Sequence, residues 1–167
     1  MTFSTSPSRA ERPLVGWLAR LTTVFADASV RNAGTTAADY IRATQTAHRL
    51  GRQLAAFHAT SDVLLTPALA TLPPKLGWID MMMDDVHEYW RRVFHFSPFT
   101  VWFNLTGQPA IVLPLARSDA TPERTATELP VSVQFVARHG DEATLFRLAA
   151  QLEKARPWFD RKPPVAM

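Results

Sequence analysis

The sequence predicts an α/β fold in which helices pack on a few strands. Long stretches that repeat an apolar residue every three or four positions indicate amphipathic helices, and short apolar runs between turn signals indicate strands. Both kinds of segment occur along the 167 residues, of which 47% are hydrophobic. A chain of this length is expected to form one domain. It can bury a core, because a domain of about 150 residues removes about 70% of its unfolded surface from water.

The first part of the chain predicts a tail followed by one helix. Residues 1–11 are small and polar, which is typical of a disordered tail, so the folded domain is expected over residues 12–167. Pro13 suits the first turn of a helix, and apolar residues at helical spacing extend that helix to about Asp27. Its apolar face could lie on a membrane surface, but packing on a core is the favoured interpretation. The apolar positions are Leu14, Trp17, Leu18, Leu21, Val24 and Phe25.

A long helix is predicted over residues 36–59. Thr36 followed by Asp39 resembles a capping box at its start. The apolar positions form one stripe that is expected to be buried, and the arginines of this segment lie off it, where they are expected in solvent. The stripe consists of Tyr40, Ala43, Ala47, Leu50, Leu54 and Phe57.

Short strands, loops and one helix are predicted after this long helix. A short buried strand is expected over residues 62–65, a loop with several prolines over 67–79, and a helix over 81–96. A second strand is expected over residues 111–113, before a polar surface loop over 117–128.

The last two elements are a strand and a capped helix. Residues 131–137 alternate in a way that gives one face of a strand more apolar character, with Val131, Val133 and Phe135 on that face. Asp141 suits the N-cap of a helix, and Pro157 ends it. The inward residues of this helix are expected to be Leu145, Leu148, Ala149 and Leu152.

Charge and composition exclude several classes of function. The net charge is only +3, all but three of the 18 basic residues are arginine, and acidic residues interleave with them. No basic stripe for nucleic acid is therefore expected. No apolar stretch approaches the roughly 18 to 20 residues of a membrane span. The chain has no cysteine and no secretory apolar region near Met1, which fits a cytoplasmic protein.

The densest group of ionisable residues is Asp84, Asp85, His87 and Glu88. On a helix Asp84, His87 and Glu88 would share one face, which is possible spacing for a metal. A solvated acidic turn is the favoured interpretation, so neither a metal nor a cofactor is expected. The other histidines are His48, His58, His95 and His139, and they are interpreted as surface or packing residues because sequence shows no nucleophile and acid beside them.

Aromatic residues crowd the segment that leads to Asn104. They are Phe94, Phe96, Phe99, Trp102 and Phe103. Such density lines apolar pockets, but it also builds cores. The candidates for a substrate pocket are Phe99, Trp102, Phe103 and Asn104. Asn104 and Gly107 also suit a turn, and for them the structural role is favoured.

Several motifs in the second half of the chain are specific in order and spacing. They read Asn104-Leu105-Thr106-Gly107-Gln108-Pro109-Ala110, Leu129-Pro130-Val131-Ser132-Val133-Gln134, Asp141-Glu142-Ala143-Thr144-Leu145 and Pro157-Trp158. This part closely resembles the C-terminal end of the amidase signature hydrolases, and Asp62 to Pro67 resembles the family's strand after the long helix. The resemblance implies that the predicted strands belong to a larger mixed sheet. It also implies that the aromatic segment lies near the acyl-binding side of the active site.

The catalytic segment of that family is missing from this sequence. The family resemblance implies amide hydrolysis by a serine that is acylated, with a second serine held by a cis peptide and a lysine relaying its proton. A Gly/Ser-rich turn must present those groups and the oxyanion donors. Average usage would give about 12 glycines, but this chain has 6, all isolated, and it has no Ser-Ser pair. Lys75, Lys154 and Lys162 have no Gly/Ser-rich neighbours, so no catalytic residue is assigned. Ser132 stands where the family usually has glycine.

The resulting hypothesis is that the chain is the C-terminal portion of a carboxamide hydrolase. It would supply scaffold and part of the acyl pocket and would be inactive alone. A truncated gene, a split subunit and a fragment all fit. The alternatives are a non-catalytic interaction module or pseudo-enzyme relic, and an amidotransferase-type subunit.

The partners expected from this hypothesis are of two kinds. An amide substrate would bind only together with the missing catalytic part. The strands at 62–65 and 131–137 should have an unpaired edge or an uncovered apolar face, and such surfaces favour association. Self-association or binding of a partner chain is therefore expected, unless the chain is poorly stable alone.

Overall fold

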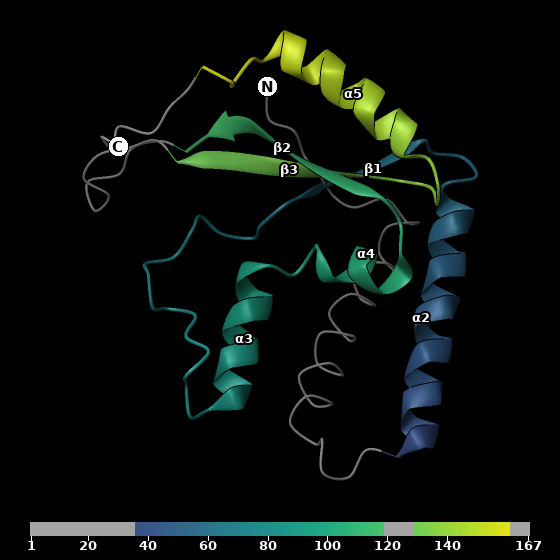
Figure 1. Cartoon of the computed structure of the whole chain (residues 1–167), viewed down its shortest axis with the longest axis vertical. Helices are drawn as coiled ribbons and strands as arrows, with labels where there is room; N and C mark the ends of the chain where they lie inside the picture. The colour runs from purple at the N-terminus through teal and green to yellow at the C-terminus, as the bar shows by residue number, and fades with distance from the viewer. Residues whose placement is uncertain (1–35, 119–128, 161–167) are drawn as a thin grey trace, which may run out of the picture.

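A computed structural model of the chain describes residues 36–118 and 129–160. The expected tail at 1–11, the expected helix after Pro13 and most of the expected loop at 117–128 lie outside these residues. Figure 1 shows the described elements in chain order. They are α2 (Ala37–Phe57), β1 (Val63–Pro67), α3 (Val86–Phe96), α4 (Val101–Thr106), β2 (Ala110–Arg117), β3 (Pro130–Ala137) and α5 (Glu142–Ala155). The predicted α/β class is confirmed.

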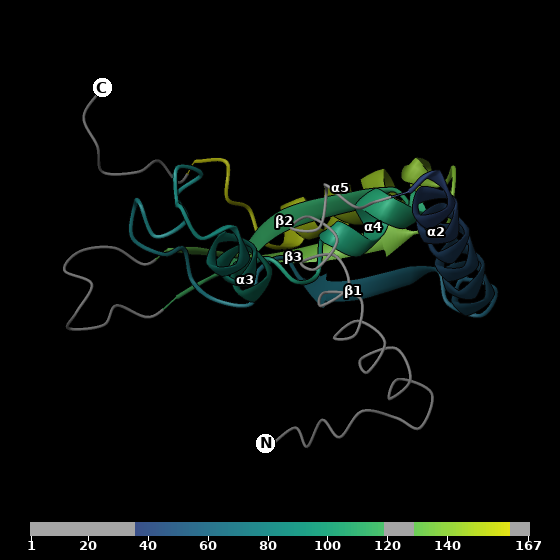
Figure 2. The ribbon, with the colours of Figure 1, turned by 90° about the horizontal axis from the view of Figure 1, so that it is seen from below.

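The three described strands form an antiparallel sheet in the order β1-β3-β2. The last strand in sequence is therefore the central one, with Leu65 of β1 and Ile111 of β2 both paired with Phe135. β2 is longer than the strand predicted at 111–113, and its register shifts between Leu113 and Ala116. Figure 2 shows β1 and β2 on either side of β3.

Helices cover both faces of this sheet. On one face Leu113, Phe135 and Ala137 pack with Leu145 and Ala149 of α5. On the other face Val136 packs with Leu54 of α2 and Phe103 of α4, and Leu64 of β1 joins this second cluster. Figure 1 shows α5 on one side of the sheet and α4 on the other. Both faces are buried at the end of β3, because Gln134 and Val136 on one face are buried as well as Phe135 on the more apolar face.

The long helix α2 begins as predicted, but its stripe is only partly buried. The Thr36 side chain accepts a hydrogen bond from the Asp39 N–H, and Asp39 accepts one from the Thr36 N–H, so the capping box is present. The buried part of the stripe lies near its end, at Leu54. Tyr40 at the other end is 71% exposed, which corrects the expectation of one continuous buried face.

Two other expectations about the elements are corrected. The helix predicted from residue 81 begins at Val86, because the Asp85 side chain caps it by accepting from the Glu88 N–H at 3.0 Å. β1 is not a fully buried strand, since Leu65 at its centre is 59% exposed. In the described part of the chain no helix is both long and apolar enough to cross a bilayer.

Candidate functional site

The aromatic segment folds as a turn and the short helix α4, held by local hydrogen bonds. The indole Nε1 of Trp102 donates to the Pro98 carbonyl at 2.8 Å, and the hydroxyl oxygens of Ser97 and Thr100 lie 2.8 Å apart. Trp102 is only 5% exposed. These contacts fix the direction in which the segment approaches the sheet.

The structure does not gather the four pocket candidates around one space. Phe103 is buried in the cluster with Leu54 and Val136, so it serves the core. Trp102 is buried beside it, whereas Phe99 is half-buried and Asn104 is exposed. Consecutive helical residues point about 100° apart, since 3.6 residues make one turn. Phe103 and Asn104 therefore face different surroundings.

The turn after α4 depends on Gly107 and not on Asn104. Asn104 lies inside α4, which corrects its assignment to a turn. Gly107 adopts φ +79 as the C-cap, and its N–H donates to the Phe103 carbonyl at 2.8 Å. A left-handed cap of this kind favours glycine. A Cβ on Gly107 would also lie 3.2 Å from Cε1 of His139, so the end of α4 is packed closely against the loop after β3.

Gln108 and His58 are buried polar side chains; the sequence indicated a surface or packing role for His58 and no role for Gln108. Gln108 follows the cap, and its Oε1 lies against the hydroxyl of Thr106, which also donates to the Trp102 carbonyl. His58 lies at the end of α2, with Nδ1 3.1 Å from the Ser61 carbonyl. The Nε2 atoms of both residues are buried and have no hydrogen-bond partner within the described ranges. The position of Gln108 in the quoted Asn-to-Ala motif was the available signal for it.

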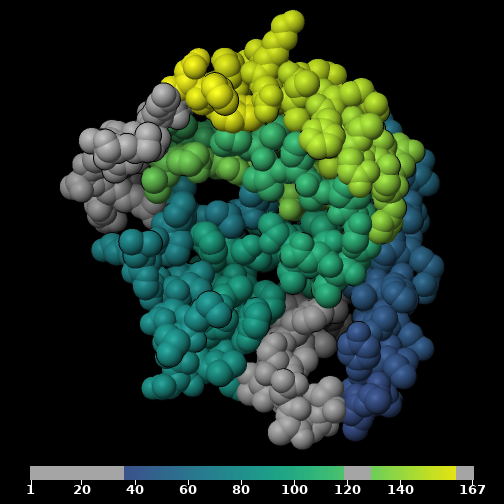
Figure 3. Space-filling model, in the orientation of Figure 1, coloured from purple at the N-terminus to yellow at the C-terminus, as the bar shows by residue number. Residues whose placement is uncertain are grey.

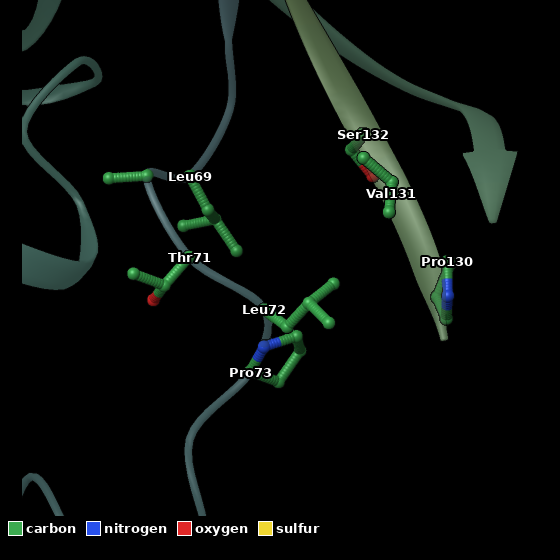
Figure 4. Close-up of a pocket in the computed structure, with 8 residues that line it drawn as sticks. Leu69, Thr71, Leu72, Pro73, Pro130, Val131 and Ser132 are labelled. Carbon is green, nitrogen blue, oxygen red and sulfur yellow. The ribbon is translucent and has the colours of Figure 1, made fainter. Parts of the chain in front are cut away.

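Two hollows are formed by the described residues away from the pocket candidates. One, of about 260 Å³, lies between the loop after β1 and the start of β3 (Figure 4). Figure 3 shows the molecule hollowed between the green strands and the blue-green segment beside them. The other, of about 310 Å³, lies between the end of β2 and the end of α5. The first hollow is lined by Leu69, Ala70, Thr71, Leu72, Pro73, Pro130, Val131 and Ser132.

Ser132 lines this first hollow at the point where β1 leaves the sheet. Its carbonyl accepts from the Ala68 N–H at 3.1 Å, one residue beyond the end of β1. The Ala70 N–H instead bonds the Phe96 carbonyl at 3.0 Å, so the chain has turned away from β3 by that point. The start of β3 is therefore left open on this side.

The acidic group at the start of α3 is a helix cap and an ion-pair network. Asp84 lies before the helix, so it does not share a helical face with Glu88. Hydrogen bonds from Arg91 and then Arg92 lower the pKa of Glu88 from 4.5 to about 2. Arg92 also donates to the Trp78 carbonyl at 2.7 Å. No set of three metal-ligating side chains occurs within residues 36–118 and 129–160.

The remaining candidates for catalysis are spread over separate elements. His58 is buried at the end of α2, His95 lies edge-on to Trp78, and His139 lies beside Gly107. Lys75 and Lys154 are exposed. A nucleophile needs a base within hydrogen-bond reach and an orienting group behind it. The part of the chain that the structure describes offers no such arrangement around these residues.

Comparison with known proteins identifies a family and relatives that match a large part of the chain. The family model described as Amidase matches residues 16–146. A Mycobacterium leprae protein that carries the amidase name AmiC is 44% identical over 110 residues, which cover 66% of this chain and 22% of AmiC. The 6-aminohexanoate-cyclic-dimer hydrolase of Paenarthrobacter ureafaciens is 36% identical over 107 residues, which cover 61% of this chain and 20% of the hydrolase.

Solved structures share the same fold. The structure of 6-aminohexanoate cyclic dimer hydrolase aligns with a TM-score of 0.58 and 30% identity, over 77% of this chain and 26% of the hydrolase chain. The same hydrolase complexed with substrate aligns with a TM-score of 0.62 and 28% identity, over 79% and 27% of the two chains. The chain thus spans about a fifth of the length of the curated relatives it matches.

Proposed function

Because this chain belongs to the amidase family, we propose that it supplies scaffold and part of the acyl pocket of a carboxamide hydrolase. The hydrolase would act on a linear or cyclic amide by the serine, cis-serine and lysine mechanism that the family resemblance implies. The catalytic segment of this hydrolase would not be supplied by the residues of this chain. The same proposal includes a cytoplasmic location.

The observation that supports this proposal is that the chain matches the amidase family but lacks the Gly/Ser-rich catalytic segment. The match extends over residues 16–146, yet the chain has no Gly-Gly or Ser-Ser pair. Acyl transfer needs an activated nucleophile and preorganised oxyanion donors. The described lysines are exposed and the described histidines are scattered, so these residues support a role in holding and shaping a site.

The part of the chain proposed to meet the substrate is the aromatic segment before β2. Phe99 is half-buried and Asn104 is exposed, so both can still contact a ligand or another part of an amidase. Trp102 and Phe103 are buried, so they would not contact the substrate but would hold α4 in position. The pocket role is therefore proposed for Phe99 and Asn104 by contact, and for Trp102 and Phe103 by support.

A partner chain is the second part of the proposal, and exposed apolar side chains support it. Large apolar residues at the surface are unremarkable singly, but several here lie on the sheet and on the helix that covers it. Examples are Leu65, Val112 and Phe146. The same observation favours the alternative function, a non-catalytic interaction module.

The experiment that tests the proposal is a chimera. Residues of this chain replace the matched segment of the P. ureafaciens hydrolase, and hydrolysis of the cyclic dimer in its name is measured. The chimera should retain turnover, whereas the isolated chain should release no product from a panel of amides. Enzymes typically turn over at about 10 s⁻¹. Turnover near that rate by the isolated chain, surviving purification, would refute the proposal, as would a folded chimera without activity.

A further inference from the structure

Two buried side chains near the junction of α2 and the α4–β2 turn each leave one polar atom unsatisfied. Gln108 is 6% exposed and His58 is 4% exposed, and within the described ranges the Nε2 atom of each has no hydrogen-bond partner. Burial without a partner costs such an atom its hydration, so buried polar atoms in folded proteins are nearly always bonded to a protein group or to an ordered water. The two atoms therefore need a partner that the described residues do not supply.

The hydrogen bonds of Thr106 determine which end of the Gln108 amide is left unsatisfied. The Thr106 hydroxyl has one hydrogen, and it donates this hydrogen to the Trp102 carbonyl at 2.8 Å, as a hydroxyl inside a helix often does. Toward Gln108 the same hydroxyl can only accept, so the amide N–H of Gln108 must be the group that lies against it. A half-turn of the amide exchanges its oxygen and nitrogen without changing its shape. The unsatisfied atom of Gln108 is then Oε1, which is an acceptor.

The unsatisfied atom of His58 is an acceptor as well. Its Nδ1 lies 3.1 Å from the Ser61 carbonyl, and because a carbonyl oxygen only accepts, Nδ1 carries the hydrogen. In a neutral imidazole the other nitrogen, Nε2, then has a lone pair and no hydrogen. Two acceptors cannot bond each other, so Gln108 and His58 can be satisfied together only by a group that donates to both.

The fold brings the two side chains toward the same junction. His58 follows Leu54 by one helical turn, and Gly51 lies on the same face of α2, because residues three or four apart share a face. On this face a Cβ at Gly51 would lie 3.7 Å from the carbonyl of Thr106, two residues before Gln108, and Leu54 packs on α4. Figures 1 and 2 both show α4 next to α2.

We propose that Gln108 and His58 bind one water molecule, buried between the end of α2 and the α4–β2 turn. The water donates one hydrogen to Oε1 of Gln108 and the other to Nε2 of His58. Folded proteins contain about one buried water per 27 residues, and such waters bridge polar groups that are otherwise unsatisfied. A water fits these two atoms because it is small and has two hydrogens to donate.

The water extends a chain of hydrogen bonds that runs through the aromatic segment. The indole of Trp102 donates to the Pro98 carbonyl, and the hydroxyl of Thr106 donates to the Trp102 carbonyl. Gln108 then donates to the Thr106 hydroxyl, and the water joins Gln108 to His58. The aromatic segment is thus tied to the end of α2 by polar contacts as well as by the apolar cluster.

A double-mutant cycle on the full chain tests whether one water serves both residues. Gln108→Leu and His58→Phe each remove one acceptor and leave the other without its full set of bonds, so each should lower the urea midpoint of unfolding, by roughly 1 M at most. The double variant removes both acceptors together, so its loss should be smaller than the sum of the two single losses. The matched control is Gln134→Leu combined with His58→Phe. Gln134 is 3% exposed but donates to the Thr66 hydroxyl at 3.1 Å, so these two losses should add.

Nuclear magnetic resonance of the native chain tests the same site without a substitution, and it decides the matter if the variants do not fold. Long-range proton–nitrogen correlations should place the imidazole hydrogen of His58 on Nδ1. An Overhauser effect from a bound water should reach both the ring hydrogen Hε1 of His58 and the side-chain amide of Gln108. A hydrogen on Nε2, or an effect from water at one residue or at neither, would overturn the proposal. Additive losses in the Gln108 cycle, or the same departure from additivity in the Gln134 control, would also overturn it.

Discussion

Removal of the Trp102 side chain should remove a large share of the stability of the fold. The indole is 5% exposed and donates to the Pro98 carbonyl at 2.8 Å. Truncation of a buried tryptophan to alanine costs about 3–5 kcal/mol, whereas a whole domain is stable by about 5–15 kcal/mol. With a urea dependence of about 1–3 kcal/mol per molar, Trp102→Ala should lower the unfolding midpoint by about 1 M or more. Trp102→Phe should cost less, because it keeps an aromatic ring and loses one hydrogen bond worth about 1 kcal/mol.

Urea titration followed by circular dichroism measures these differences, with Phe159→Ala as the control. Phe159 is almost fully exposed, so its truncation should change stability by no more than about 0.5 kcal/mol. A midpoint for Trp102→Ala equal to that of the native chain would refute the structural role. In the active chimera, Trp102→Ala distinguishes a role of Trp102 in the core from a role in the substrate pocket. Turnover per folded molecule should stay unchanged if Trp102 only supports α4, and should fall if it contacts substrate.

Three further predictions use other features of the fold. Gly107→Ala should destabilise the chain more than Gly140→Ala in thermal unfolding. Both glycines have positive φ, but only at Gly107 would a Cβ lie 3.2 Å from a His139 ring atom. Equal losses of stability would show that the His139 side chain moves aside at no cost. The pKa of Glu88 is lowered to about 2 by two arginines on α3, so its contribution is present above the ordinary pKa of 4.5 and is lost as pH falls towards 2. Glu88→Gln should therefore be less stable than the native chain at pH 7 and equal to it near pH 2, and a difference that does not change with pH would contradict this. Light scattering of the purified chain should show association, or fluorescence of a hydrophobic dye should show that the chain binds the dye. A monodisperse monomer that binds no dye would show that the chain buries its apolar surface without a partner.

Local signals in the sequence predicted the helix starts well. Thr36 with Asp39 and Asp141 with Thr144 are caps that depend only on residues three apart. Such contacts form wherever the neighbouring chain is helical, so the sequence contains all that they require. The start of α3 was misplaced because Asp85 is a strong cap inside a segment whose apolar spacing continues on both sides.

The burial of each element could not be predicted, because it depends on neighbours that are distant in sequence. β1 has the apolar composition of a buried strand, yet its place at the edge leaves Leu65 exposed. The alternation in β3 indicates which face is more apolar, but only its central place in the sheet explains why both faces are buried at its end. For the candidate site, Phe99 and Phe103 are equally aromatic, and only the packing of α4 on Val136 separates a core residue from a half-buried one.

The strand order has a consequence for synthesis of the chain on the ribosome. Thr66 in β1 and Gln134 in β3 share a side-chain hydrogen bond at 3.1 Å across a separation of 68 residues. Translation adds about 5–20 residues per second, so β1 waits roughly 3–14 s before its partner is made. Neither β1 nor β2 can pair within the described sheet until β3 arrives, because β3 lies between them. Nascent chains of this protein therefore expose two apolar strands for seconds, and a ribosome-associated chaperone would have its longest opportunity to bind in that interval.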